Sequence, residues 1–424
     1  MRAPILLTVL LIAATAGCDA SPRRADAALA FAAGSAARAP AGSAAWSAPR
    51  AEMALSDALG RTGRHGIASV AVDGRGMVHA VFGVDADGDG RPDALQYARL
   101  EGGAWSAPQP VATTLSLADA AQVAVDGDGA VHVVWLAHAG AAPRTSPTEV
   151  MHRVLRGGGW SAPRVLYHEA NRWGMHVRWL AAATDARGEV RVLFAPEGRG
   201  FGHLRLRGGT ASEPAFLDHD GNMMAFSASA PGAPLEMAYI GERVSRERPR
   251  AANDVFVRPL SARGAWGAST EAYYGPDRFS HYPQLVIDRR GVRHLFWLED
   301  VDGSVNPEAV YASTSADGVT WSRPVDVTPV QVRGGVPLRL FAAIDGTDRI
   351  HLLVRYATAG PPRVQLAYFS VAGGRVEAER TLARAGEIGP GEAQLAYDRA
   401  HHRLIALWRG GDGVYRTAER ATDG

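Results

Sequence analysis

Short apolar runs alternate with polar turns along most of the chain, and the alternation repeats at a spacing of about fifty residues. One run, Ser69–Val72, leads into the turn Asp73–Gly76, and a nearly continuous apolar run, Val78–Phe82, follows it. A turn with Asp first and Gly fourth suits a type I β-turn. An apolar run without alternation suits a strand that is buried on both faces. The pattern therefore predicts pairs of antiparallel strands joined by tight turns.

This strand–turn–strand pattern recurs through the chain. Strong or weak copies are centred on six aspartates: Asp73, Asp126, Asp185, Asp288, Asp345 and Asp398. A degenerate copy fits between the third and the fourth, around Met224–Ile240, with Ser229 in the place of the aspartate. Self-similar units of this length are typical of a β-propeller, in which each unit forms one blade. We predict an all-β fold, a seven-bladed β-propeller, with six blades as the alternative.

A second motif, Trp-Ser-x-Pro, ends the complete units. It begins at Trp105, Trp160 and Trp321, 32 to 34 residues after the aspartate of its unit. In the last unit it would fall beyond the final residue, whereas an extra copy at Trp46 precedes the first unit. We therefore expect the N-terminal strand to complete the last blade, a "velcro" closure that removes the open sheet edges. Residues 44–424 would then form one propeller domain.

The first residues have the features of an export signal. The apolar stretch from Pro4 to Ala14 follows Arg2 and is too short to span a bilayer as a helix. It leads to Thr15-Ala16-Gly17-Cys18, which resembles the lipobox of bacterial lipoproteins, and Cys18 is the only cysteine of the chain. The resemblance implies a signal peptide at 1–17 and lipidation of Cys18. Residues 18–43 would form a flexible tether, and the lipid would anchor the protein in the cell envelope, in the periplasm or at the cell surface.

The charge balance bears on possible partners. The 45 basic residues, all arginine, are matched by 44 acidic ones, and no basic stripe runs along the sequence. A protein that binds a phosphate backbone needs concentrated positive charge, so we expect no nucleic-acid partner.

One acidic segment has the spacing of a calcium loop. Asp85, Asp87, Asp89 and Asp93 occupy positions one, three, five and nine, with Gly90 at position six. The segment resembles the calcium loops of integrin-type propellers, but Gln96 stands where an EF-hand has its bidentate glutamate. We predict a structural calcium ion here; the alternative is a solvated acidic hairpin.

Histidine and tryptophan each recur about once per unit, so a metal site or a sugar-binding site has to be considered. Six residues after the unit aspartate come His79, His132, Arg191, His294 and His351. One histidine per blade places neighbours too far apart to share a metal ion, so we predict that they support the aspartate turns. For the repeated tryptophans we predict packing between blades rather than sugar binding.

The loops that precede the innermost strands should converge at the mouth of the central channel. They and the first strand residues offer a set of basic and aromatic side chains: His65, Arg172, Trp173, His176, Arg178, His281 and Tyr282. The rest of the same ring consists of Arg64, Asp119, Asn171, His219, Asp220, Arg278, Arg333, Arg339, Glu387 and Glu392. Arginine binds carboxylates through two parallel hydrogen bonds, and aromatic rings stack on sugar faces. An anionic saccharide would suit this set.

Ser315–Trp321 resembles a shortened Asp-box, the turn motif of BNR-repeat and sialidase-like propellers. The resemblance covers most of the chain as a repeat pattern and implies the propeller fold rather than an activity. Sialidases need an arginine triad, an aspartate and a tyrosine–glutamate pair, and no such pair and no Arg-Ile-Pro motif is recognisable here. Propeller polysaccharide lyases use histidine and tyrosine beside an arginine, and His281, Tyr282, His176 and Arg178 would suit that chemistry.

Three functions remain open from the sequence. The leading one is a membrane-anchored binding module for a glycan or an envelope partner. The alternatives are a carbohydrate-active enzyme, either a sialidase-like glycosidase or a polysaccharide lyase, and a scaffold for a protein complex.

Overall fold

A computed structural model describes most of the chain beyond residue 44. The described residues are 45–52, 67–84, 94–112, 116–138, 147–169, 177–196, 199–217, 221–229, 233–241, 253–276, 278–358, 364–372, 375–389, 393–412 and 414–422. The predicted signal peptide, Cys18, the tether and the Asp85–Asp93 loop lie outside these residues. In the described part of the chain, no helix is long and apolar enough to cross a membrane.

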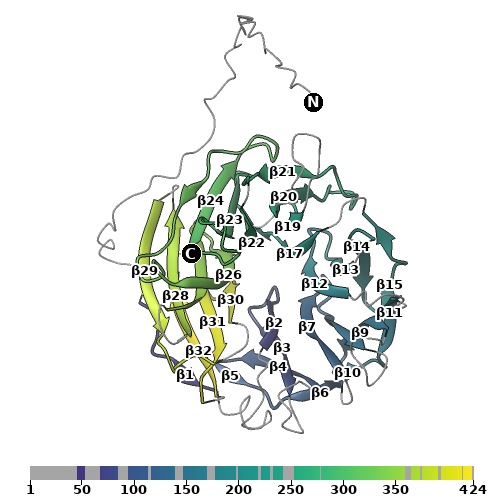
Figure 1. Ribbon diagram of the computed structural model, residues 1–424. Helices are drawn as coiled ribbons and strands as arrows, with labels where there is room; N and C mark the ends of the chain where they lie inside the picture. The colour runs from purple at the N-terminus through teal and green to yellow at the C-terminus, as the bar shows by residue number, and fades with distance from the viewer. Residues whose placement is uncertain are drawn as a thin grey trace, which may run out of the picture.

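Seven antiparallel sheets are arranged around a central axis, as Figure 1 shows. Blade 1 contains β2 (Ile67–Val72), β3 (Val78–Val84), β4 (Ala94–Glu101), β5 (Ala104–Trp105) and β6 (Gln109–Ala112). Blade 2 contains β7 (Ser116–Val125), β8 (Val131–His138), β9 (Thr148–Arg156), β10 (Gly159–Trp160) and β11 (Arg164–Glu169). Blade 3 contains β12 (Val177–Thr184), β13 (Val190–Pro196), β14 (Gly202–Arg207), β15 (Thr210–Ala211) and β16 (Ala215–Phe216).

The other four blades follow in chain order. Blade 4 contains β17 (Asn222–Phe226), β19 (Glu236–Gly241), β20 (Asp254–Pro259) and β21 (Thr270–Tyr273). Blade 5 contains β22 (Ser280–Ile287), β23 (Arg293–Glu299), β24 (Ala309–Ser315) and β25 (Val325–Asp326), with β18 (Ala228–Ser229) at its inner edge. Blade 6 contains β26 (Val336–Ile344), β27 (Ile350–Ala357), β28 (Val364–Ala372) and β29 (Arg375–Ala383). Blade 7 contains β30 (Gln394–Asp398), β31 (Arg403–Arg409), β32 (Tyr415–Ala421) and β1 (Arg50–Ala51).

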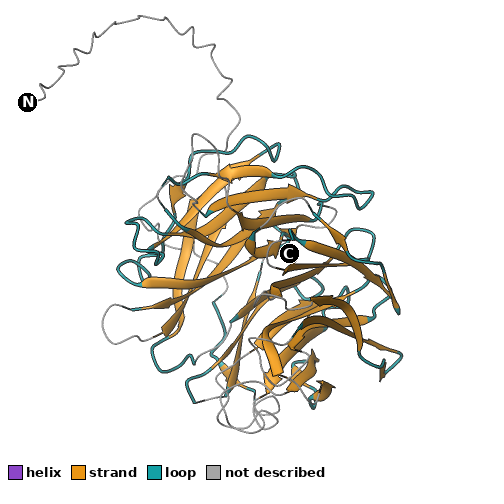
Figure 2. Cartoon of the chain, turned by 45° about the vertical axis from the view of Figure 1, so that its right-hand side comes forward, coloured by secondary structure: helices purple, strands orange, loops and turns teal. Residues whose placement is uncertain are grey.

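Every described regular element is a strand, as the colouring of Figure 2 makes plain. The prediction of an all-β, seven-bladed propeller is confirmed, and the six-bladed alternative is wrong. We call the end of the propeller that carries the aspartate turns the turn face. The opposite end, where the innermost strands begin, is the loop face.

The predicted closure of the ring is present. β1 pairs antiparallel with β32, with Arg50 opposite Thr417. Ser47 exchanges hydrogen bonds with Glu419: its amide donates to the Glu419 carbonyl, and its hydroxyl accepts the Glu419 amide. Trp46 is buried, with its ring edge-on to that of Tyr368 in blade 6 at a centroid distance of 5.2 Å. A segment from the start of the domain therefore forms the outer strand of the last blade.

The aspartate turns share one hydrogen-bond pattern. In five of them Oδ1 accepts the backbone amides two and four residues later, as Asp126 does from Asp128 and Ala130. The other carboxylate oxygen lies near the residue six positions on, 3.1 Å from His132 Nε2 in blade 2 and 3.0 Å from His351 Nε2 in blade 6. Blade 3 uses Arg191, at 2.7 Å from Asp185, in the same way. The structural role predicted for these histidines is confirmed.

The degenerate unit forms blade 4, but the residue predicted to replace its aspartate is wrong. Ser227, not Ser229, occupies the place: its amide donates to the Glu236 carbonyl and its hydroxyl accepts the Glu236 amide. Ser229 instead belongs to β18, which leaves blade 4 and pairs parallel with β22 of blade 5. A serine has one oxygen where the aspartate has two, so it cannot hold the four-residue turn in the same way, and the connection here is longer.

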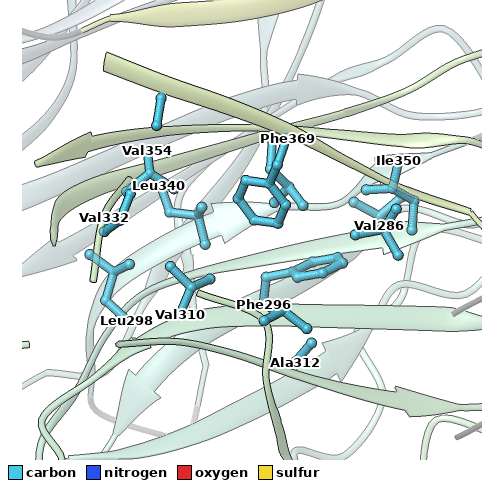
Figure 3. Close-up of a cluster of buried hydrophobic side chains, with 14 of the residues drawn as sticks. Val286, Phe296, Leu298, Val310, Ala312, Val332, Leu340, Ile350, Val354 and Phe369 are labelled. Carbon is cyan, nitrogen blue, oxygen red and sulfur yellow. The ribbon is translucent and has the colours of Figure 1, made fainter. Parts of the chain in front are cut away.

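Apolar seams between neighbouring blades form the core. Figure 3 shows the seam of blades 5 and 6, where Phe296 and Leu298 of β23 face Leu340 of β26 and Phe369 of β28. The repeated tryptophans lie in such seams; for example, Trp160 of blade 2 meets Tyr97 of blade 1 edge-on at 5.3 Å. Their predicted packing role is confirmed, and each blade depends on both neighbours to cover its faces.

We expect Trp46→Ala to lower the free energy of unfolding by about 3 to 5 kcal/mol, because it empties a buried site in the closing blade. The measurement is the urea midpoint of purified protein. Val319→Ala, at a side chain that is 67% exposed, is the control and should change stability by less than about 0.5 kcal/mol. Equal effects of the two substitutions would show that the closing strand does not hold the ring.

The stability of the fold should also fall in acid, because two buried histidines, His132 and His152, are hydrogen-bonded in a way that requires their neutral forms. Arg164 Nε donates to His152 Nδ1, and the remaining His152 and His132 contacts lead to Asp126. Burial, His132 and Arg164 lower the pKa of His152 to about 3. Below pH 6.5 the unfolded chain takes up a proton that the folded chain refuses, so stability present above pH 6.5 is lost as the pH falls towards 3.

The check is the urea midpoint between pH 7.5 and pH 4.5. His152→Gln should be less stable than the wild type at pH 7.5 but should lose less on acidification. Parallel pH profiles for the two proteins would contradict the assignment.

Candidate functional site

The innermost strands of the seven blades line the central channel. They are β2, β7, β12, β17, β22, β26 and β30, and each contacts the innermost strands of the two neighbouring blades. All seven begin at the loop face and run to the turn face. Side chains near their first residues therefore surround the mouth of the channel.

Six of these seven strands have a register irregularity near their start. The shifts fall between Ile67 and Ser69, Leu117 and Ala121, Val177 and Leu180, Asn222 and Ala225, His281 and Gln284, and Pro337 and Arg339. An irregularity of this kind breaks the ladder and re-aims the side chains beside it. The repeat therefore places a ring of re-aimed residues at one level of the channel.

Three large side chains meet at this level, and we call Trp179, Tyr282 and Arg339 the channel cluster. The Arg339 Cζ lies 3.8 Å from the centroid of the Tyr282 ring and 5.8 Å from that of Trp179. The two rings are 6.3 Å apart and inclined at 64°. The residues come from blades 6, 5 and 3. Since blades 3 and 6 are not neighbours, their contact has to cross the channel, where the guanidinium gains cation–π attraction from both rings.

Tyr282 has an unusual backbone conformation. Its φ is +48°, in the left-handed region that residues with a Cβ seldom adopt. His281 pairs with Leu298 and Gln284 with Phe296, so Tyr282 and the residue after it face Trp297 alone. The Tyr282 ring on this bulge contacts Arg339 and Trp179.

Only some of the seven side chains predicted at the mouth of the channel belong to the described residues. The structure describes His281 and Tyr282, which are half-buried neighbours with ring centroids 6.2 Å apart. Burial lowers the pKa of His281, so its imidazole is neutral at pH 7. Arg178 lies in β12, but its side chain is outside the described part. His65, Arg172, Trp173 and His176 also lie outside the described residues.

A buried carboxylate lies beside the start of β22. Glu299 has no exposed surface, and it accepts hydrogen bonds from Tyr273 Oη at 2.9 Å, Ser280 Oγ at 2.8 Å and Trp297 Nε1 at 2.8 Å. Burial raises its pKa more than these donors lower it. The sequence showed no tyrosine–glutamate pair, yet Tyr273 and Glu299 form one. Tyr273 is on the outer strand of blade 4, so this pair joins two blades rather than lining the channel.

A cluster of three acidic residues lies in the loop directly after Glu299, on the loop face of blade 5. Carboxylate oxygens of Asp300, Asp302 and Glu308 lie within 4.8 Å of one another, an arrangement that suits a cation. Asp300 accepts the backbone amides of Gly303, Ser304 and Val305, so part of its charge is already satisfied within the loop.

Sequence reasoning missed this group, although a signal was present. Residues 300–308 repeat the pattern Asp-x-Asp-Gly-x-x-x-Pro-acid of residues 85–93, at the same place between the second and third strands of a blade. It also missed Trp179, which lies inside a strand and carries no motif.

No known protein family matches the sequence, and no curated protein does. Solved structures match at the level of fold. A polysaccharide lyase, described as a PL25 ulvan lyase bound to -[GlcA(1-4)Rha3S]-, aligns with a TM-score of 0.57 and 13% identity over 88% of this chain and 94% of its own. A protein of unknown function from Dyadobacter fermentans aligns with a TM-score of 0.52 and 12% identity, covering 90% and 100% of the two chains.

A third match is the GH93 α-L-arabinofuranosidase of Fusarium graminearum, with a TM-score of 0.50, 10% identity and coverage of 90% and 98%. The chain therefore shares its overall fold with these proteins, two of which are named as carbohydrate-active enzymes. At such low identity the likeness establishes the fold and no activity.

Proposed function

We propose that the protein is a binding module of the cell envelope that recognises a glycan with carboxylated sugar units at the loop face. The observation that carries the proposal is the channel cluster. An arginine held over one aromatic ring and close to a second offers a carboxylate partner and sugar-stacking surfaces in one place.

A guanidinium can bind a carboxylate at its edge while its face stays against an aromatic ring. It has five N–H donors in its plane, and the cation–π contact uses its face rather than these donors. Arg172, Trp173 and His176, which precede β12 in the sequence, and Arg178 of β12 would extend the site around the mouth. The predicted lipid on Cys18 would hold the propeller at a membrane.

A polysaccharide lyase is the second candidate. A neutral imidazole at His281 beside the Tyr282 phenol supplies a proton acceptor and a proton donor next to Arg339. In a lyase these groups would remove the proton next to a uronate carboxylate and protonate the leaving glycosidic oxygen. The likeness to the ulvan lyase supports the same class of ligand, and turnover is what separates the two candidates.

Glycan-array binding of the full chain in detergent tests the proposal. We expect binding to uronate or sialate glycans that falls about tenfold or more in Arg339→Met, because a charge-assisted hydrogen bond is worth about 1.5 to 3 kcal/mol. Arg75→Met, at an exposed arginine on the turn face, is the matched control and should bind normally.

The other outcomes are equally informative. Release of unsaturated sugars from a bound polyuronate, lost in Tyr282→Phe, would make the protein a lyase. Failure to bind any glycan would refute the carbohydrate proposal and favour a scaffold for envelope proteins.

A calcium ion in the Asp85–Asp93 loop is a further part of the proposal. Support comes from blade 5, where the same residue pattern brings three carboxylates together. Oxygen ligands at this spacing suit calcium, and the ion would stiffen a hairpin on the loop face.

Calcium should therefore raise the melting temperature of the full chain, and magnesium at the same concentration should raise it less. Asp87→Asn should remove the shift. Asp128→Asn, at an exposed turn-face aspartate, is the control and should keep it. If Asp302→Asn removes the whole shift and Asp87→Asn none of it, the ion belongs to blade 5 and the assignment to Asp85–Asp93 is wrong.

A further inference from the structure

The conformation of Tyr282 has to be imposed by its surroundings. A residue with a Cβ is sterically strained in the left-handed region, and such a conformation persists only where neighbouring contacts over-determine it. Pro283 restricts Tyr282 further, because a residue before proline is pushed away from the right-handed helical region. The contacts that frame this bulge therefore decide where the Tyr282 ring lies.

Glu299 frames the bulge from two sides. Its Oε2 accepts one hydrogen bond from Ser280, two residues before Tyr282, and one from Trp297, the residue that faces the bulge on β23. Its Oε1 accepts the hydroxyl of Tyr273 from the outer strand of blade 4. One buried carboxylate thus holds the strand before the bulge, the strand opposite it and the neighbouring blade.

We propose that Glu299 is a positioning residue for ligand binding: it fixes the bulge that presents Tyr282 to Arg339, although its own hydrogen bonds go to residues outside the channel cluster. This inference rests on the proposed function, since it takes Tyr282 to be a ligand contact. It makes ligand affinity at the channel depend on a side chain in the seam between blades 4 and 5.

The same seam supplies a matched control at its other end. Glu236 of blade 4 is 1% exposed and accepts hydrogen bonds from Arg293 of blade 5, at 2.6 Å from Nη2 and 3.1 Å from Nε. It lies at the turn face, far along the strands from Tyr282. Replacing Glu236 should weaken the seam without disturbing the bulge.

The test follows the Tyr282 ring directly by NMR of the full chain with ¹³C-labelled tyrosine rings. Tyr282→Phe identifies its signal among the 11 tyrosines. We expect Glu299→Gln to shift the Tyr282 signal and to reduce affinity for a uronate oligosaccharide about tenfold. Glu236→Gln should lower the melting temperature and leave both the signal and the affinity unchanged.

A milder pair of variants covers the case in which Glu299→Gln does not fold. Ser280→Ala removes one donor and should shift the Tyr282 signal in the same direction, and Ser280→Thr, which keeps a hydroxyl, should restore it. If Ser280→Ala only lowered the stability of the fold, the Tyr282 signal would stay in place in both variants.

The outcomes separate the inference from the proposed function. An unchanged Tyr282 signal in folded Glu299→Gln or in Ser280→Ala overturns the positioning role, whatever the protein binds. If the signal shifts as expected but the wild type binds no glycan, Glu299 positions the bulge and the carbohydrate proposal is what fails. A shifted signal with unchanged glycan affinity refutes the claim that this position matters for binding.

Discussion

The structure depends on the burial of both faces of every blade. A sheet such as blade 5, with Phe296 and Val286 in its apolar seams, cannot be stable in water by itself. Each blade is covered by the next, so the ring has to close for the last seam to form. Closure comes from β1, which joins blade 7, and from Trp46 shortly before it, which packs against Tyr368 of blade 6. The need to close the ring explains why a strand from the start of the domain belongs to the last blade.

The two ends of the propeller are built by different physical rules. At the turn face, buried carboxylates accept backbone amides and face a histidine or an arginine, so polar groups such as Asp126 and Asp345 are paired where burial makes unpaired groups costly. At the loop face, the starts of the innermost strands contain bulges, and Met223 and Tyr282 adopt left-handed conformations there. The aspartate turns are alike in five blades, whereas the starts of the innermost strands differ from blade to blade.

This division explains how much the sequence could predict. The aspartate turns depend on residues within seven positions of one another, so their repeat predicted the blades and their number. The repeat of Trp-Ser-x-Pro, with its extra copy at Trp46, predicted the closing strand. Where the aspartate is absent, the local signal fails, and the role of Ser227 was assigned to Ser229. The candidate site was predicted only in part: the sequence offered Tyr282 and Arg339, together with the neighbouring His281, but not Trp179. Trp179 and Arg339 lie 160 positions apart and meet only because the ring brings blades 3 and 6 to opposite sides of one channel.

The channel is crossed at two levels, and this bears on how a ligand can approach. The channel cluster spans it near the loop face, from blade 3 to blades 5 and 6. Towards the turn face, β18 lies along the inner edge of β22, and Arg399 of blade 7 donates a hydrogen bond to the Ser229 carbonyl. A ligand of the proposed site would arrive from the loop face and lie across it, within reach of the bulged strands of several blades. In such a site, selectivity depends on which side chain each bulge presents, and the contacts that hold a bulge in place matter as much as those that touch the ligand.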